Sequence, residues 1–370
     1  MKNCKKILFL GNSKLTVFGF RGEIIQRLVK DGHDVYVSFP NGPFGEGKEI
    51  SKEYHCHFIE TDINRRGTNP LKDLKLLRFY KKIMKEIKPD IVFAFTVKCD
   101  IYGGLACRQL KIPFVPNITG LGKGLTEGRI TKIITKYLYK ISIKDSLCVF
   151  FQNDGDKDFF VNHKIKFQKS IVLPGSGVNL TKFQPLPYPK DDVVKFLYIA
   201  RVMKAKGIEE YLEAARVLMK KYHNLEFHIC GFCEEDYKDI IDKEQSNKNI
   251  IYHGLVDNVQ EYVKNCHCIV LPSFHPEGIS NVLLEAAASA RPIITTNRIG
   301  CKETLEDGKT GYLVKEKDAE DLIHKMELFL SLSNIEKKNM GLNGRDYIEK
   351  RFNRDDVVNE YLQCLMECGD

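Results

Sequence analysis

The sequence lacks any run of about 18 consecutive apolar residues, so it contains no segment with the composition of a membrane-spanning helix. Its first residues, MKNCKKILFLGNSK, begin with basic side chains, but the apolar run that follows is short and breaks at Gly11. No small-residue cleavage site follows that break. We therefore expect the segment to form the first β-strand and a turn, and not a signal peptide.

Metal and nucleic-acid signatures are also missing. Cys230 and Cys233 have the spacing of two metal ligands, but no second pair completes a zinc site, and most of the 12 cysteines lie in apolar contexts. We therefore expect reduced thiols, no metal and no cofactor. The sequence has no aromatic-and-arginine stacking platform and no helix-turn-helix pattern, which disfavours nucleic-acid binding.

What is present is a long globular chain with uneven charge. With 370 residues, the chain is too long to fold around a single hydrophobic core of ordinary size. Its composition, 43% hydrophobic and 29% charged residues, is typical of a globular protein. Residues 1–180 carry a net charge of +14, from 31 basic and 17 acidic side chains, whereas residues 181–370 carry −6. A basic half joined to an acidic half indicates that the first half meets a polyanion or an anionic membrane.

Strand and helix patterns alternate in both halves, which predicts an α/β protein with two Rossmann-like, doubly wound domains. In the first half we expect strands at 5–11, 34–40, 55–61, 90–96, 112–119 and 146–153, and helices at 18–33, 69–90, 99–111 and 129–145. In the second half we expect strands at 194–200, 225–231, 249–254, 266–273, 292–297 and 312–314, and helices at 206–223, 281–290 and 318–332. The expected domains are 1–172 and 193–352, with a Pro- and Gly-rich linker at 173–192 and a final helix at 353–370.

The most informative stretch is PEGISNVLLEAAASARP, in which Glu277 and Glu285 are eight residues apart. Ser280 or Asn281 can cap a helix that ends at Arg291-Pro292, which places backbone N–H groups beside two carboxylates. Helix N-termini bind phosphate and carboxylates bind sugar hydroxyls, so the stretch suits a nucleotide-sugar. The alternative is an amphipathic surface helix with two solvated glutamates.

A second motif, ARVMKAKG, follows a strand of the second half and opens a helix. Arg201 and Lys206 therefore lie at the carboxyl end of a strand, where open α/β sheets bind their ligands. Arginine can hold a phosphate with two hydrogen bonds, and lysine can act on it as a point charge. We expect the pair to bind a diphosphate, and a solvated basic turn is the alternative.

Two loops of the first half are further candidates. Gly11-Asn12-Ser13 follows the first strand, and the glycine-dense segment ITGLGKGLTEG follows a later one. Glycine permits close backbone approach to a ligand, although a plain connecting loop explains either segment as well. The dinucleotide-binding pattern Gly-x-Gly-x-x-Gly is missing.

The helix expected at 129–145 is basic and amphipathic. One face carries a lysine at every fourth position: Lys132, Lys136, Lys140 and Lys144. The other face is apolar: Ile130, Ile133, Ile134, Tyr137, Leu138 and Ile141. Such a helix can lie on an anionic bilayer. The alternative is an ordinary domain helix with its apolar face in the core and its lysines in water.

Together these motifs resemble the retaining glycosyltransferases of family 4, which have the GT-B architecture of two Rossmann-like domains facing a central cleft. The resemblance is carried by ARVMKAKG, HGLVDNV, PSFHPEGISNVLLEAAASARPIITTN with its Glu-x7-Glu, GYLV and PGSGVNLTKF, whose order fits nearly the whole chain. In the first half, FTVKCDIYGG and PNITGLG look like the bacterial branch that builds capsule, O-antigen and lipid-linked glycans.

The resemblance implies roles for second-half residues. Arg201 and Lys206 would neutralise the donor diphosphate, Glu285 would hold the ribose hydroxyls, and Glu277 would contact the transferred sugar. The remaining donor contacts would come from Val256 against the base and from the backbone of Gly278, Ile279, Ser280 and Asn281. The last helix, from about Arg354 to Cys368, would cross back to the first domain.

The acceptor side would lie on first-domain residues: Asn12, Ser13, Arg21, Thr96, Lys98, Thr119 and Gly120. The chain departs from the family here, because many members carry a His near the reacting sugar where this sequence reads Thr96-Val97-Lys98. Lys98 or Thr96 would take its place, unless another group enters. We count Lys98 with Glu277, Arg201 and Lys206 as candidate catalytic residues.

The implied activity is retaining transfer of a sugar, of UDP-hexosamine or UDP-galactose type, to a polyprenyl-diphosphate-linked saccharide. The protein would be cytoplasmic and peripheral on the inner face of the cell membrane, would contact its anionic surface, and would need no metal. Two alternatives remain at this point: a nucleotide-sugar epimerase-type enzyme of the same architecture, and a non-catalytic partner of another transferase.

Overall fold

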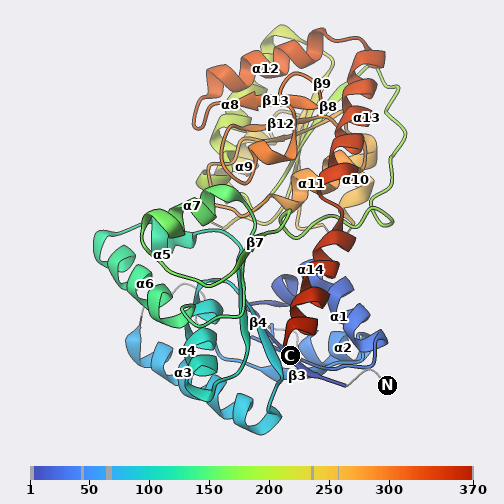
Figure 1. The fold of residues 1–370 in the computed structure, drawn as a ribbon. Coiled ribbons are helices and arrows are strands. Elements are labelled where there is room, and N and C mark those ends of the chain that lie inside the picture. The colour runs from blue at the N-terminus through green and yellow to red at the C-terminus, as the bar shows by residue number, and fades with distance from the viewer. Residues whose placement is uncertain (1–3, 43–45, 64–68, 235–236, 257, 369–370) are drawn as a thin grey trace. The chain divides into compact units, whose positions relative to one another are not determined.

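The computed structural model describes residues 4–42, 46–63, 69–234, 237–256 and 258–368. The chain forms two compact units (Figure 1). Unit 1 contains Met1–Ser176 and Asp355–Asp370, and unit 2 contains Gly177–Arg354. Each unit is built on its own parallel sheet, so the predicted α/β class with two Rossmann-like domains is confirmed.

The described strands of unit 1 form one parallel sheet. In sheet order they are β3 (His57–Glu60), β2 (Asp34–Phe39), β1 (Lys6–Leu10), β4 (Ile91–Phe95), β5 (Phe114–Ile118), β6 (Val149–Phe151) and β7 (Ser170–Val172). Strands β4 and β5 are buried along their whole length, because helices cover both faces of the sheet. This explains why they read as apolar runs and not as alternating patterns.

Helices cover the two faces of this sheet through separate cores. One face packs against α1 (Phe20–Lys30), α2 (Glu46–Glu53) and α14 (Arg354–Glu367). The other packs against α3 (Pro70–Ile87), α4 (Gly104–Leu110), α6 (Arg129–Ser142) and α7 (Asp154–Asn162). Short elements complete the unit: the π-helical turns η1 (Leu15–Gly19) and η2 (Cys99–Gly103), which lead into α1 and α4, and α5 (Gly122–Thr126) before α6.

Helix α14 belongs to unit 1 although it ends the sequence, and Figure 1 shows it beside α1 and α2. Its Tyr361 ring lies 5.0 Å from Phe93 and 4.9 Å from Phe150, and its hydroxyl accepts a hydrogen bond of 2.7 Å from Asn117. The C-terminal helix is therefore part of the hydrophobic core of unit 1.

The described strands of unit 2 form a second parallel sheet. In sheet order they are β10 (Ile250–Gly254), β9 (Leu225–Cys230), β8 (Val194–Ile199), β11 (Cys268–Leu271), β12 (Ile293–Thr296) and β13 (Gly311–Val314). Helix α8 (Ile208–Lys221) packs beside α12 (Ala319–Ser331), and α11 (Asn281–Ala288) packs beside α13 (Asn334–Arg351). The remaining elements are α9 (Lys238–Glu244), α10 (Val259–Asn265), η3 (Lys204–Lys206) and η4 (Lys302–Thr304).

Most of the segment predicted as a linker, 173–192, is an ordered part of unit 2. Val178 and Phe183 are buried in its core, and the backbone N–H of Val178 donates to the Phe352 carbonyl at 2.8 Å. The division between the units falls at Ser176 and Gly177, and the return to unit 1 falls between Arg354 and Asp355. The segment is irregular because of its prolines and glycines, but it is held by packing.

Strand order places one ligand-binding edge in each unit. In unit 1 the chain reverses direction along the sheet between β1 and β4, and in unit 2 it does so between β8 and β11. Ligands of open α/β sheets bind beyond the carboxyl ends of the strands at such a switch point. A ligand is therefore expected to contact the loops after these four strands.

Helix α6 turns much of its apolar face to solvent, whereas an ordinary domain helix buries that face. Four of the six side chains of the predicted apolar face are between 52% and 74% exposed: Ile130, Ile133, Ile134 and Tyr137. The buried positions are Thr135, Tyr139 and Ser142. Leu138 packs against the unit 1 core and Ile141 is half-buried, so the alternative of an apolar face in the core does not hold for the four exposed side chains. Lys144 lies beyond the end of the helix.

Candidate functional site

Arg201 follows β8 and is held by the neighbouring strand β9. Gly231, just past β9, has a φ of +141°, and a Cβ there would lie 1.8 Å from the Ala200 carbonyl oxygen. Glycine therefore lets the two strand ends approach closely. Arg201 Nη1 forms an ion pair of 2.6 Å with Glu234 Oε2, a residue of the loop after β9. The guanidinium is thus oriented at the carboxyl edge of the sheet.

Lys206 and Glu277 come from the two sides of the switch point and meet there. Lys206 ends η3 after β8, and Glu277 lies in the loop after β11. Gly207 has a φ of +78°, and a Cβ there would lie 2.1 Å from the Pro272 carbonyl oxygen, so a larger residue would push these segments apart. Lys206 Nζ contacts Glu277 Oε1 in an ion pair, and the two side chains are only 13% and 14% exposed.

Burial lowers the pKa of Lys206 to about 8, and the Arg201 guanidinium acts in the same direction. The Glu234 carboxylate acts in the opposite direction, because it stabilises the protonated ammonium. Two cations and two carboxylates are therefore gathered after β8, β9 and β11, and all four side chains are at most 35% exposed.

The loop that carries Glu277 is positioned by Gly300, after β12. The backbone N–H of Ser280 donates to the Gly300 carbonyl at 2.8 Å. Gly300 has a φ of +92°, and a Cβ there would lie 2.7 Å from the Glu277 carbonyl oxygen and 2.9 Å from that of Gly278. Close backbone packing therefore fixes the turn from Glu277 to Ser280.

Helix α11 starts at this turn and presents polar groups near its N-terminus. Ser280 is the N-cap residue, but within the described residues its side chain makes no capping hydrogen bond. Asn281 Oδ1 is buried and has no hydrogen-bond partner in the described part of the chain. One turn later on the same face, Glu285 has its pKa raised to about 7 by burial, against the opposing influence of Arg354 and Lys182.

Val256 lies apart from this cluster in the strand order. It follows β10, which β9 separates from β8, and its side chain packs against the unit 2 core. The structure describes only part of the HGLVDNV motif around Val256, because Asp257 lies outside the described residues. The predicted contact with the base therefore stays a prediction.

The first-half candidates surround the switch point of unit 1. Thr96 follows β4 with a φ of +82°, an uncommon conformation for a β-branched residue. Lys98 Nζ forms an ion pair of 2.6 Å with Asp73 Oδ1 on α3, and the Tyr102 hydroxyl donates to the other oxygen of Asp73 at 3.0 Å. Lys98 is therefore engaged with Asp73 in this structure.

Asn12 and Ser13 lie after β1 and both hydrogen-bond Thr16, at 2.8 and 2.9 Å. They line a cavity of about 320 Å³. The other residues lining it are Lys14, Leu15, Phe39, Pro40, Gly42, Glu46 and Gly47. Arg21 is buried, with its guanidinium 4.3 Å from the Phe95 ring centre. Thr119 and Gly120 are half-buried after β5.

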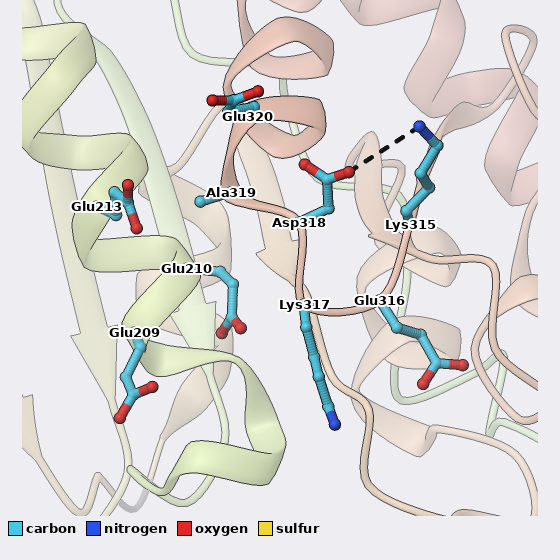
Figure 2. A pocket seen from close by; sticks show the side chains of 9 residues that line it. All are labelled: Glu209, Glu210, Glu213, Lys315, Glu316, Lys317, Asp318, Ala319 and Glu320. Carbon is cyan, nitrogen blue, oxygen red and sulfur yellow. Dashed lines mark ion pairs between the residues drawn. The ribbon is translucent and has the colours of Figure 1, made fainter.

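A larger cavity of about 480 Å³ lies in unit 2 between the start of α8 and the segment 315–320 (Figure 2). Its lining is mainly acidic: Glu209, Glu210, Glu213, Glu316, Asp318 and Glu320, with Lys315, Lys317 and Ala319. Carboxylates repel a diphosphate, so this cavity does not fit the anion that Arg201 and Lys206 suit.

Three contributors to the site were missed by sequence reasoning. Glu234 and Asp73 hold Arg201 and Lys98, and neither belongs to a motif that was recognised in the sequence. Gly300 did carry a signal, because a glycine directly after a predicted strand often marks a close backbone approach. Across the described residues no group of three or more His, Cys, Asp or Glu is placed to hold a metal ion. In the same residues no helix has the length and apolar character needed to cross a bilayer.

Comparison with known proteins identifies the family. The model of group 1 glycosyl transferases matches residues 181–347, and the glycosyl transferase 4-like model matches residues 6–153. The chain belongs to the GT-B glycosyltransferases. It is therefore a transferase enzyme of the type found in bacterial polysaccharide biosynthesis, and the predicted family is confirmed.

Relatives of this glycosyltransferase match over most of its length. One is the N,N'-diacetylbacillosaminyl-diphospho-undecaprenol alpha-1,3-N-acetylgalactosaminyltransferase of Campylobacter jejuni, 27% identical over 342 residues, which are 88% of this chain and 89% of the relative. Another is the capsular polysaccharide biosynthesis glycosyltransferase CapM of Staphylococcus aureus, 26% identical, covering 99% and 97%. HepE of Anabaena, solved with UDP and glucose, has a TM-score of 0.80, 15% identity and coverage of 98% and 100%, which shows the shared fold.

Proposed function

We propose that this glycosyltransferase transfers a sugar from a UDP-sugar to a polyprenyl-diphosphate-linked saccharide with retention of the α configuration. The observation that carries the proposal is the meeting of Arg201, Lys206 and Glu277 at the β8–β11 switch point, next to the N-terminus of α11. Positive charge for a diphosphate and carboxylates for sugar hydroxyls lie together there.

In the proposed complex, the donor diphosphate contacts Arg201, Lys206 and the first backbone N–H groups of α11. Each cation now contacts a carboxylate of its own chain, Glu234 or Glu277. The diphosphate takes over these contacts in part, which leaves Glu277 available to accept from hydroxyls of the transferred sugar. Glu285 accepts from the ribose hydroxyls, and the backbone from Gly278 to Asn281 contacts phosphate or sugar.

The proposed chemistry is electrostatic. The bond between the anomeric carbon and the diphosphate oxygen breaks, and the carbon becomes oxocarbenium-like. Arg201, Lys206 and the positive end of α11 stabilise the negative charge that develops on the leaving diphosphate. The acceptor hydroxyl bonds to the same face of the carbon, and its proton passes to an oxygen of the leaving phosphate. We propose that no metal is required, because the two cations neutralise the diphosphate.

The acceptor and the location follow from the relatives in the same proposal. The Campylobacter relative is named for a diphospho-undecaprenol acceptor, and HepE was solved with UDP and glucose. We infer a polyprenyl-diphosphate-linked acceptor on the unit 1 loops and a UDP-hexosamine or UDP-galactose donor. The enzyme would then work as a peripheral protein at the anionic inner surface of the cell membrane.

A transfer assay tests the proposal. Purified enzyme is incubated with radiolabelled UDP-N-acetylgalactosamine, UDP-N-acetylglucosamine or UDP-galactose and with synthetic polyprenyl-diphosphate-linked saccharides. We expect one donor to label the lipid fraction, with an α linkage by NMR. The Lys206→Met variant should lose at least 100-fold of this activity, whereas Lys204→Met, two residues away on the exposed side of η3, should retain it.

Consumption of a UDP-sugar without any acceptor, giving an epimerised sugar, would replace the proposal with an epimerase. The absence of product from every donor and acceptor combination, in a protein that still binds UDP, would count against the proposed acceptor class. Equal loss in the Lys204→Met and Lys206→Met variants would count against the proposed role of Lys206.

A further inference from the structure

Helix α6 exposes a continuous apolar strip to solvent. At about 100° per residue, Ile130, Ile133, Ile134 and Tyr137 fall within an arc of about 100° on one side of the helix. All four are more than half exposed. Scattered exposed apolar side chains are normal, but a strip along one helix marks an interaction surface.

The opposite side of α6 packs tightly against the rest of unit 1, and this packing fixes the orientation of the helix. The Tyr139 hydroxyl donates to Asp100 Oδ2 at 3.2 Å, and its ring packs edge-on against Phe160 with centres 5.1 Å apart. Thr135 is buried against the preceding segment, where a Cβ on Gly124 would lie 3.1 Å from its hydroxyl. The fold therefore holds the apolar strip outward.

Positive charge runs along one flank of this strip. By the same angular count, Arg129, Lys132, Lys136 and Lys140 lie between the apolar strip and the buried side. The helix sequence from Arg129 to Ser142 contains no Asp or Glu. An apolar strip with basic residues along its edge matches the layering of a bilayer surface, where acyl chains lie below anionic headgroups.

We propose that α6 is the membrane-docking element of this enzyme: Ile130, Ile133, Ile134 and Tyr137 enter the outer part of the acyl layer, and the basic flank contacts anionic headgroups. The proposal rests on the proposed function for its purpose, since it gives the route to a lipid-linked acceptor. It adds to that function by assigning the membrane contact to the apolar strip. The lysines alone would give only adsorption that salt weakens.

A fluorescence experiment tests the insertion directly. The chain has no tryptophan, so the Tyr137→Trp variant carries a single reporter in the strip. The full-length variant is titrated with vesicles of phosphatidylglycerol and phosphatidylcholine that contain no acceptor lipid. We expect a blue shift of its emission and quenching by brominated acyl chains. The matched Ile335→Trp variant, at a position 73% exposed on α13 of unit 2, should show neither.

Vesicle sedimentation then separates the two parts of the surface. The double variant Ile130→Ser with Ile134→Ser should bind anionic vesicles at least tenfold more weakly than the unmodified chain. The Ile335→Ser variant should bind normally. The Lys136→Gln with Lys140→Gln variant should lose affinity for anionic vesicles and keep what affinity there is for pure phosphatidylcholine. Because none of the five changed positions is buried, unchanged thermal unfolding is the folding control.

Two outcomes would overturn the proposal. One is vesicle binding that the isoleucine double variant leaves unchanged. The other is a blue shift of the Tyr137→Trp variant that depends on protein concentration and appears without vesicles, which would make the strip a contact between copies of the chain. UDP binding, measured on the same variants, reports on the donor site in unit 2, so failure of the docking proposal and failure of the proposed function are distinguishable.

Discussion

At the residue scale, the protonation state of Lys206 ties the donor site to pH. Burial lowers its pKa to about 8, so the side chain carries its charge below pH 8 and loses it above. Only the charged form attracts a diphosphate. The Glu234 carboxylate acts against the effect of burial and helps to retain the proton near neutral pH.

We predict that UDP affinity falls as pH rises through 8. At pH 9 roughly one-tenth of Lys206 would stay protonated in the free enzyme, which gives an affinity about tenfold weaker than at pH 7. Isothermal titration calorimetry between pH 7 and 9.5 measures this. The Lys206→Met variant should bind weakly with little pH dependence. A wild-type affinity that stays constant over this range would show that Lys206 does not contact the diphosphate.

The pKa of Glu285 shifts in the opposite direction from that of Lys206: burial raises it from an ordinary 4.5 to about 7. The native state holds its proton more tightly than the unfolded state between these values, so ionising Glu285 costs stability as pH rises through this window. An ionised buried carboxylate therefore weakens the fold at pH 8. Such a residue is easier to explain by a ligand contact than by stability.

The Glu285→Gln variant should therefore be more stable and less functional. At pH 8 its free energy of unfolding should rise by of the order of 2 kcal/mol, since the cost of the buried charge is removed. Its UDP affinity should fall at least tenfold, since an amide is a weaker acceptor for ribose hydroxyls than a carboxylate. Calorimetry measures both, with Glu213→Gln on α8 as an exposed control. Unchanged UDP affinity would remove Glu285 from the donor site.

At the element scale, the turn from Glu277 to Ser280 depends on the loop after β12. A Cβ at position 300 would clash with the carbonyl oxygens of Glu277 and Gly278, and the Gly300 carbonyl accepts from the Ser280 N–H. Two structural elements after β11 and β12 thus position the start of α11 together. A side chain at position 300 would have to move the turn.

We predict that Gly300→Ala lowers stability by about 1–3 kcal/mol and UDP affinity by at least tenfold. Gly308→Ala is the matched control: its φ is +75°, close to the +92° of Gly300, but a Cβ there meets nothing within 4 Å. The control should lose only the stability that a positive φ costs a non-glycine residue, and it should keep normal UDP affinity. Thermal unfolding and UDP titration on both variants give the comparison. Equal UDP affinity in the two variants would mean that the turn does not position the donor.

Apolar periodicity located the elements that bury an apolar stripe, and it missed α13 for a physical reason. Helix α13 packs on α11 through backbone and polar groups: a Cβ at Gly341 would lie 2.2 Å from the Ala290 carbonyl oxygen, and Arg345 donates to the Ala288 carbonyl at 2.9 Å. A glycine contact and a buried arginine leave no hydrophobic pattern in the sequence.

Periodicity also identified α6 as amphipathic without giving its orientation. A sequence pattern shows that one face is apolar, but only the packing of Thr135, Tyr139 and Ser142 shows that this face is turned outward. In the site, Arg201 and Lys206 were predictable because ARVMKAKG joins a predicted strand to a helix, and Glu277 because it precedes a predicted helix start in PEGISNVLLEAAASARP. Glu234 was not, because its contact depends on the neighbour relation of β8 and β9.

At the scale of the whole molecule, the proposed function assigns the donor site to unit 2 and membrane docking to unit 1. The donor cluster brings Arg201 and Lys206 together in unit 2, whose 26 basic and 27 acidic side chains nearly balance. The first half, with +14, carries the outward strip of α6. The C-terminal helix returns to complete the core of unit 1.

The most direct test of the central claim is a calorimetric unfolding scan of the full chain with UDP and, separately, with GDP. A ligand that binds only the native state raises stability by about 2.7 kcal/mol at 100 times its dissociation constant. We predict a higher unfolding temperature with UDP than with GDP, a larger rise with one UDP-sugar, and no rise in the Arg201→Met with Lys206→Met variant. The same unfolding temperature with and without every nucleotide, or an equal rise in that variant, would contradict a UDP-sugar site at the β8–β11 switch point.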